Sequence, residues 1–116
     1  MDYESYLPEI DIENAMRRLR NNLKLYKLVL DSFDPENHIL ELNKAIASGN
    51  PDSVASAAHA LKGVAANLSL TRINDLAKEI EMAARQGNIE SEKMQGLEAE
   101  IDGARKKIAR FKEEIA

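Results

Sequence analysis

Apolar residues recur at helical spacing along most of the chain, and no stretch alternates apolar and polar residues as a half-buried strand would. The pattern therefore predicts helices alone. Helix starts are marked by N-cap residues at Asp11, Asn22, Asp34 and Asn50, and the last two each precede Pro and an acidic residue. Gly49 and Gly87 mark helix ends. The expected ranges are 12–20 and 23–33 for two short helices, and 36–47, 52–68, 71–86 and 91–114 for four longer ones.

Short connections between the four longer helices make neighbours in sequence antiparallel. We therefore expect an all-α fold, with an antiparallel up-down four-helix bundle over residues 36–114 and the short helices of residues 1–33 packed on it. The 116 residues have the length of one domain, so the expected domain is 1–116. The first ten residues carry apolar side chains that can anchor them, namely Tyr3, Tyr6, Leu7 and Ile10.

The last predicted helix has apolar residues at alternating spacings of three and four. Such a seam is typical of a coiled-coil dimer, but it also suits one wall of an intramolecular bundle. Three more amphipathic helices are present to receive it, and Gly96 and Gly103 weaken a free-standing coil, so the second interpretation is favoured. The seam residues are Met94, Leu97, Ile101, Ala104, Ile108, Phe111 and Ile115.

The composition of the chain excludes some kinds of chemistry and argues against others. Hydrophobic residues make up 44% of the chain and charged residues 31%, which is typical of a globular protein. No Cys is present, which excludes disulfides and thiolate chemistry, and two His far apart in sequence argue against a His-based metal cluster. A net charge of −4 argues against general nucleic-acid binding. No apolar run has membrane-spanning length and the N-terminus is not a signal peptide, so we expect a soluble cytoplasmic protein.

His59 lies off the apolar face of the predicted helix 52–68. At about 100° per residue, the apolar face of this helix is separated from His59 by a wide angle, so the imidazole should reach solvent. A histidine in the core would lie on that face instead. The residues of the face are Val54, Ala57, Ala58, Leu61, Ala65 and Leu68.

The neighbours of His59 on this helix are small apart from Lys62. They are Ala55, Ser56, Lys62, Gly63 and, one turn further, Ala66. A solvated helix face normally carries long side chains. Gly63 costs about 1 kcal/mol of helix stability relative to Ala, which indicates that something approaches closely at this point.

The residues suit a phosphoryl acceptor. Imidazole is largely neutral at pH 7 and forms covalent intermediates, and Lys62 offers a point charge suited to a phosphoryl group. The five Gly are isolated from one another, so there is no phosphate-binding loop, and no Mg²⁺-binding carboxylate cluster is evident. The pattern alone is also compatible with an ordinary surface histidine on an Ala-rich helix.

The stretch Ala58–Leu68 resembles the signature of the histidine-containing phosphotransfer (HPt) domain of bacterial phosphorelays, with Leu, Lys and Gly two, three and four residues after the His and then Asn-Leu. The segment 73–87 resembles that family's next helix, and residues 10–33 resemble its entry helices. The family usually has Gly after Asn-Leu, where this chain has Ser69. Because Ser can N-cap the next helix, we expect an altered turn and intact chemistry.

The resemblance implies a phosphocarrier rather than an enzyme. His59 would accept a phosphoryl group from the phospho-Asp of one receiver domain, in a response regulator or hybrid sensor histidine kinase, and pass it to the Asp of another. The protein would need no cofactor of its own, since the receiver supplies Mg²⁺. Lys62 would stabilise the phosphoryl charge, Gly63 would admit the receiver, and Ala55, Ser56 and Ala66 would form the docking surface. Asn67 would be structural, and we expect a monomer.

Other features favour plainer interpretations. His38 lacks the small surround and the Lys, so it is interpreted as a surface residue. The acidic residues of the later helices, Glu81 among them, are interpreted as solubilising charge. The basic residues Arg17, Arg18, Arg20, Lys24 and Lys27 form either a solvated face or a border of the docking site that steers acidic receivers. The competing functions are a helical scaffold that dimerises, or the phosphoacceptor domain of a chemotaxis-type histidine kinase.

Overall fold

The computed structural model describes residues 2–89 and 92–115. The described residues contain helices and no strand, so the predicted all-helical fold is confirmed. Each helix bound lies within two residues of its prediction, except that the expected start at residue 91 lies outside the described residues. The elements are a short 3₁₀ helix η1 (Glu4–Tyr6), which the pattern did not predict, and α1 (Ile12–Arg18), α2 (Leu23–Asp31), α3 (Pro35–Ser48), α4 (Pro51–Asn67), α5 (Thr71–Arg85) and α6 (Glu92–Ile115).

Local sequence signals set the helix ends. The predicted N-cap side chains at Asp11, Asn22, Asp34 and Asn50 each accept a hydrogen bond from a backbone N–H in the first turn of their helix. Gly49 and Gly87 follow α3 and α5 with φ of 71° and 82°, a left-handed conformation that glycine adopts without steric cost. The polar caps and these glycines therefore place the connections where the sequence predicts them.

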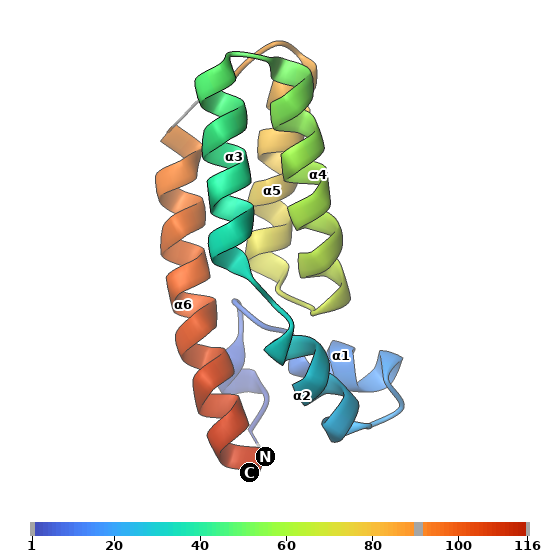
Figure 1. Cartoon of the computed structure of the whole chain (residues 1–116). Helices are drawn as coiled ribbons and strands as arrows, with labels where there is room; N and C mark the ends of the chain where they lie inside the picture. The colour runs from blue at the N-terminus through green and yellow to red at the C-terminus, as the bar shows by residue number, and fades with distance from the viewer. Residues whose placement is uncertain (1, 90–91, 116) are drawn as a thin grey trace.

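Helices α3 to α6 lie side by side along the long axis of the molecule, which measures 44 × 22 × 21 Å (Figure 1). Helix α4 packs against both α3 and α5, and α5 packs against α6. The seam of α6 is buried inside the chain from Met94 to Phe111, and Ile115 packs against the core. The seam is therefore a wall of the intramolecular core, as favoured above, and is occupied rather than free for a coiled-coil partner.

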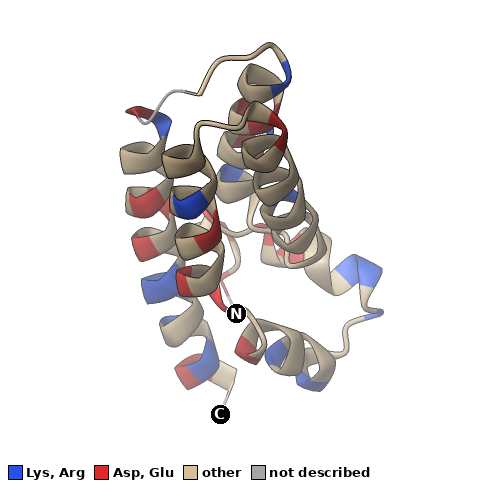
Figure 2. Ribbon diagram, turned by 45° about the horizontal axis from the view of Figure 1, so that its top comes forward, with Lys and Arg blue, Asp and Glu red and all other residues tan. Residues whose placement is uncertain are grey.

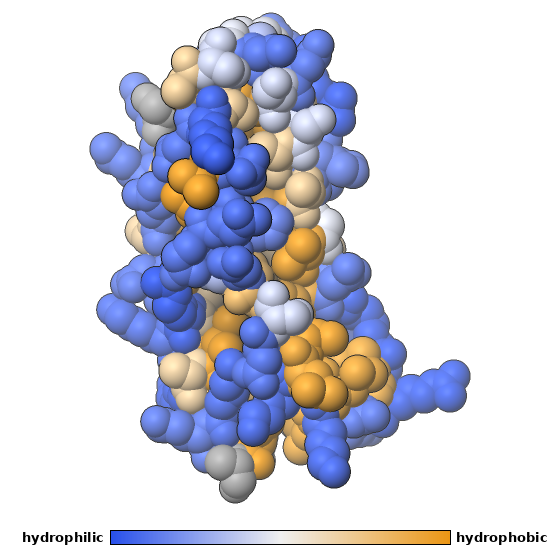
Figure 3. Space-filling model, viewed as in Figure 1, coloured by the Kyte–Doolittle hydropathy of each residue, from blue (hydrophilic) through white to orange (hydrophobic). Residues whose placement is uncertain are grey.

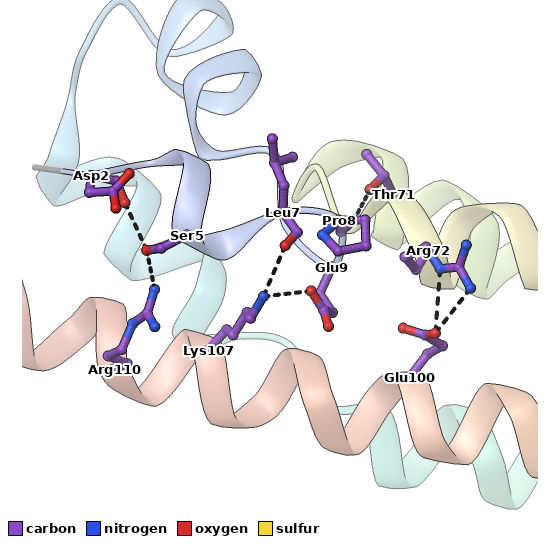
Figure 4. Close-up of polar contacts among 10 residues, drawn as sticks. All are labelled: Asp2, Ser5, Leu7, Pro8, Glu9, Thr71, Arg72, Glu100, Lys107 and Arg110. Carbon is purple, nitrogen blue, oxygen red and sulfur yellow. Dashed lines mark hydrogen bonds and ion pairs between the residues drawn. The ribbon is translucent and has the colours of Figure 1, made fainter.

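The N-terminal segment is tied to α5 and α6 by polar contacts (Figure 4). Lys107 Nζ lies 2.6 Å from Glu9 Oε2 and donates to the Leu7 carbonyl at 3.1 Å, while Arg110 donates to Ser5 Oγ at 2.6 Å. Beneath them, Tyr6 is fully buried. Leu7 is 46% exposed, so its side chain does not anchor the segment as expected; it follows η1 and turns outward.

An aromatic cluster joins this segment to the far end of α6. The ring of Phe111 meets Tyr6 at 5.7 Å and Tyr26 at 5.5 Å between centroids, both in edge-on geometry. The Tyr26 hydroxyl donates to the carbonyl of Leu68 at 2.9 Å. The N-terminal helices therefore contact both the end of α6 and the end of α4.

The turn after α4 is built on a left-handed Ser69, with φ of 58°. Its N–H donates to Ala66 O at 3.2 Å and the Leu70 N–H donates to Ala65 O at 2.8 Å, which is the pattern that glycine usually completes at a helix C-terminus. The expected N-cap role of Ser69 is wrong, because Leu70 occupies that position before α5 without a side-chain hydrogen bond. Ser69 thus adopts the conformation expected of the family's glycine.

Side-chain contacts hold Ser69 in this conformation. Its buried hydroxyl accepts a hydrogen bond from Arg18 at 2.5 Å and donates to Asn14 Oδ1 at 3.0 Å. Arg18 also donates to the Asn67 carbonyl at 3.0 Å. A left-handed residue with a Cβ costs about 1–2 kcal/mol, and these hydrogen bonds from α1 offset part of that cost.

Candidate functional site

His59 lies at the middle of α4 on the flank that faces α5. Its side chain is 63% exposed, whereas the apolar face of the same helix, including Val54, Ala58 and Leu61, is buried. The helical spacing of the sequence therefore placed the imidazole correctly at the surface. A mid-helix position fixes its backbone rigidly, because hydrogen-bonded turns lie on both sides.

A buried carboxylate on α5 meets the imidazole. Glu81 has a side chain only 6% exposed, and its Oε2 lies 2.9 Å from His59 Nδ1. The other oxygen, Oε1, lies 2.7 Å from Lys62 Nζ, and Oε2 is also 2.6 Å from an Arg85 nitrogen. The structure thus brings His59 and Lys62 together, as their one-turn spacing predicts, and adds two residues from α5.

The interpretation of Glu81 as solubilising charge is wrong. It lies next to the buried stripe of α5, about one turn after Ala77 and one turn before Ala84, both of which are fully buried. A carboxylate at that position must be paired, since an unpaired charge in the interior is very costly. Its place beside the stripe was the available signal, and only the packing of α4 on α5 shows which cations pair with it.

The cations around Glu81 keep it ionised. Hydrogen bonds from Lys62 and Arg85 lower the pKa of the Glu81 carboxyl to about 2, against the opposing effect of burial, and the contact with His59 adds to the lowering. At neutral pH this carboxylate can therefore only accept hydrogen bonds.

That acceptor sets the tautomer of His59. Since Glu81 has no proton to give, Nδ1 of the neutral imidazole carries the hydrogen and donates it to Oε2. The lone pair is then on Nε2, which has no hydrogen-bond partner among residues 2–89 and 92–115. The arrangement presents a free imidazole nitrogen to solvent as a nucleophile, with positive charge beside it.

A polar contact also fixes the two helices relative to one another. The side-chain amide of Asn74 on α5 donates to the carbonyl of Lys62, next to Gly63 on α4, at 3.0 Å. With the Glu81 contacts, this gives two attachments between α4 and α5 at the height of His59. The site is therefore positioned by its own scaffold.

The expected docking residues differ in exposure. Gly63, Ser56 and Ala66 are exposed on α4, and a Cβ at Gly63 would meet no atom within 4 Å. No contact with the residues that the structure describes therefore requires glycine at this position. Ala55 is only 4% exposed because it lies on the α5 side of the helix, so its expected place in a docking surface is wrong.

His38 lies elsewhere. It lines a groove of about 740 Å³ between α3 and α4, whose α4 wall includes Ser56 and Ala60 but not His59. The groove is open and its edge carries both acidic and basic side chains. His38 has no hydrogen-bond partner within the described part of the chain, which leaves its interpretation as a surface residue unchanged.

The basic run lies on α1, α2 and the turn between them (Figure 2). Of its members, Arg18 reaches the end of α4 through its bonds to Asn67 and Ser69. The other four are exposed and pair with no carboxylate in the described ranges. Apolar surface also gathers where α2 lies (Figure 3), and Leu25 and Leu28 are exposed there. The run thus adjoins the end of α4 through Arg18.

Comparison with family models matches residues 34–107 to the Hpt domain. The chain belongs to the Hpt domain family. Hpt domains are phosphocarrier modules of phosphorelays that interact with receiver domains of response regulators or hybrid kinases. His59 lies within the matched segment, as do Lys62, Glu81 and Arg85. Neither the curated proteins nor the solved structures compared with this Hpt domain gave a match.

Two further findings concern metal binding and membrane spanning. Among residues 2–89 and 92–115, no three His, Asp or Glu side chains are grouped to hold a metal ion. Within the same ranges, no helix combines the length and the apolar character that a membrane span needs.

Proposed function

We propose that this Hpt domain is a histidine phosphotransfer protein of a two-component phosphorelay. Nε2 of His59 accepts a phosphoryl group from the phospho-Asp of one receiver domain and passes it to the Asp of another. The observation that carries the proposal is the exposed Nε2 whose ring is held, through Nδ1, by a buried ionised carboxylate. A histidine without a role would not need that carboxylate, which costs free energy to bury.

The neighbours of His59 stabilise the phosphoryl group and contact the receiver. Lys62 stabilises the charge of the phosphoryl group, which forms only when transfer occurs. Gly63 admits the receiver, and Ser56 and Ala66 extend the contact. These three exposed positions carry no long side chain that would hold a partner away from Nε2.

The rest of the chain serves as a scaffold. We propose that α3 to α6 form an antiparallel up-down four-helix bundle, in which α5 supplies the groups that orient His59. The protein acts as a cytoplasmic monomer without a cofactor of its own, and the receiver brings the Mg²⁺. The partners are receiver domains of response regulators, of a hybrid sensor histidine kinase, or of both.

The test is transfer from a phosphorylated receiver domain. Wild-type protein should gain a phosphate that is labile in acid and stable in base, as expected of phosphohistidine. His59→Gln should gain none while its helical circular dichroism is retained, since the side chain is 63% exposed. His38→Gln is the matched control and should label like wild type. Labelling of His59→Gln near the wild-type level would refute the assignment.

A further inference from the structure

Arg85 occupies an unusual place beside His59. A terminal guanidinium nitrogen lies 2.6 Å from Glu81 Oε2, the same oxygen that accepts from His59 Nδ1 at 2.9 Å. The two nitrogens therefore lie no further apart than the sum of those distances. The Arg85 side chain is 62% exposed, whereas the Glu81 side chain that holds it is 6% exposed. An exposed, positively charged side chain thus lies close to the imidazole, held on the same carboxylate oxygen.

The need to neutralise Glu81 does not by itself explain why an arginine lies at position 85. Lys62 already pairs with Oε1 at 2.7 Å, and His59 satisfies Oε2. Arg85 pairs with Glu81 at a spacing of four residues on one helix, and only the Glu81 side of that pair is buried. The guanidinium carries five N–H donors, and in the described part of the chain its only partner is Glu81. Arg85 therefore has donors to spare next to the nucleophile.

We propose that Arg85 is a phosphoryl-binding residue, held on Glu81 in the free protein and transferred to the phosphoryl oxygens when His59 is phosphorylated. The inference rests on the proposed function of His59. Planar guanidinium groups match phosphate oxygens in bidentate geometry, which an ammonium cannot do. Arg85 and Lys62 would then bind the phosphoryl group together.

When Arg85 moves from Glu81 to the phosphoryl group, each charge of the site keeps a partner of opposite sign. In the transfer step the Nε2 lone pair forms the N–P bond, the bond from phosphorus to the donor Asp oxygen breaks, and the donor carboxylate leaves with the electron pair. The Nδ1 proton stays on the ring, so the ring becomes positively charged against Glu81. That new ion pair replaces the one from which Arg85 departs. The phosphoryl group brings a charge of about −1.5 to −2, which supplies Arg85 with a new partner.

The experiment uses phosphoramidate, a small phosphoryl donor that releases ammonia and needs no receiver. Phosphorylated wild type, Arg85→Gln, Arg85→Lys and Glu81→Gln are compared by ³¹P NMR as the pH is varied. The matched control is Arg105→Gln, which removes another exposed arginine, one that pairs with Glu36 across α6 and α3. Circular dichroism confirms that each variant is folded.

A cation on the phosphoryl group favours its dianion. Arg85→Gln should therefore raise the proton affinity of the phosphoryl group about two- to fivefold, with Arg85→Lys between it and wild type. Glu81→Gln removes the resting partner of Arg85 but keeps the cation, so it should not raise that affinity. Arg105→Gln should match wild type.

Two outcomes overturn the inference. Coincident ³¹P titrations of Arg85→Gln and wild type would show that Arg85 does not contact the phosphoryl group. Equal shifts in Arg85→Gln and Glu81→Gln would show that Arg85 acts only by supporting the carboxylate. Failure of the proposed function would look different, because phosphoramidate would then leave wild type unlabelled or would label His59→Gln equally.

Discussion

Glu81→Gln isolates what the buried carboxylate contributes to the reactivity of His59. Gln has nearly the same shape as Glu but no charge, so it can keep the space on α5 filled. As Nε2 attacks, positive charge develops on the ring, and the contact from Nδ1 to Glu81 Oε2 at 2.9 Å strengthens. The carboxylate therefore stabilises the transition state more than the free protein. The Gln amide could also donate to Nδ1 and place the hydrogen on Nε2, where it blocks attack.

The size of the effect follows from exposure. A hydrogen bond to a charged group contributes about 1.5–3 kcal/mol. The ring is 63% exposed, so water screens the interaction and the lower end applies. About 1.4 kcal/mol corresponds to a tenfold loss of rate. We therefore expect Glu81→Gln to take up phosphate from phosphoramidate about ten times more slowly at pH 7.

The assay is the initial rate of labelling at fixed phosphoramidate concentration. The matched control is Glu100→Gln, which removes another carboxylate that pairs with an arginine, Arg72 at 3.3 Å, away from His59. The control should label at the wild-type rate. If folded Glu81→Gln labels within twofold of wild type, Glu81 serves only to pair Lys62 and Arg85, and the tautomer argument is wrong.

Three other predictions concern the same face. Gly63→Gln should raise the free energy of unfolding by about 0.5 kcal/mol, because Gln is the better helix former, yet slow transfer from a phosphorylated receiver; Gly96→Gln should give the stability gain alone. An unchanged transfer rate would place the docking surface elsewhere. Lys62→Ala should lower the phosphorylated fraction at equilibrium with a receiver several-fold, and less at high salt, since a charge that is 29% exposed is still screened by water and contributes about 1 kcal/mol. No effect at either salt concentration would show that Lys62 does not interact with the phosphoryl group. Because the pKa of Glu81 falls from 4.5 to about 2 on folding, it contributes about 3 kcal/mol above pH 4.5 that is lost as the pH falls towards 2. Urea unfolding of wild type and Glu81→Gln should therefore converge at low pH, and a constant difference would contradict the ion-pair argument.

The helices were predictable because their signals are local. An N-cap such as Asp34 or Asn50 acts within its own first turn, and the apolar spacing of α4 decides by itself that His59 leaves the core. A left-handed residue is a different case. Ser69 adopts its conformation because Arg18 and Asn14 reach it from α1, about fifty residues away, so its neighbours in sequence indicate a cap instead.

The site was predictable only in part, for the same reason. His59, Lys62 and Gly63 lie on one helix, and their spacing brings them together. Glu81 and Arg85 join them only through the packing of α5 on α4, and that contact also buries Ala55, which the helix pattern alone left on the surface. Which flank of a helix meets its neighbour is a property of the whole fold.

The contacts of the N-terminal helices also define the smallest piece of this chain that could fold alone. The segment 34–107 that matches the family stops before Phe111, and it omits the two tyrosines that pack on that ring. It also omits Arg18, whose guanidinium satisfies the last carbonyl of α4. An excised 34–107 fragment would lose all three rings of this cluster and would fray at the end of the helix that carries His59. Expression boundaries for biophysical work should therefore be drawn outside the family segment, to include η1 and the last turns of α6.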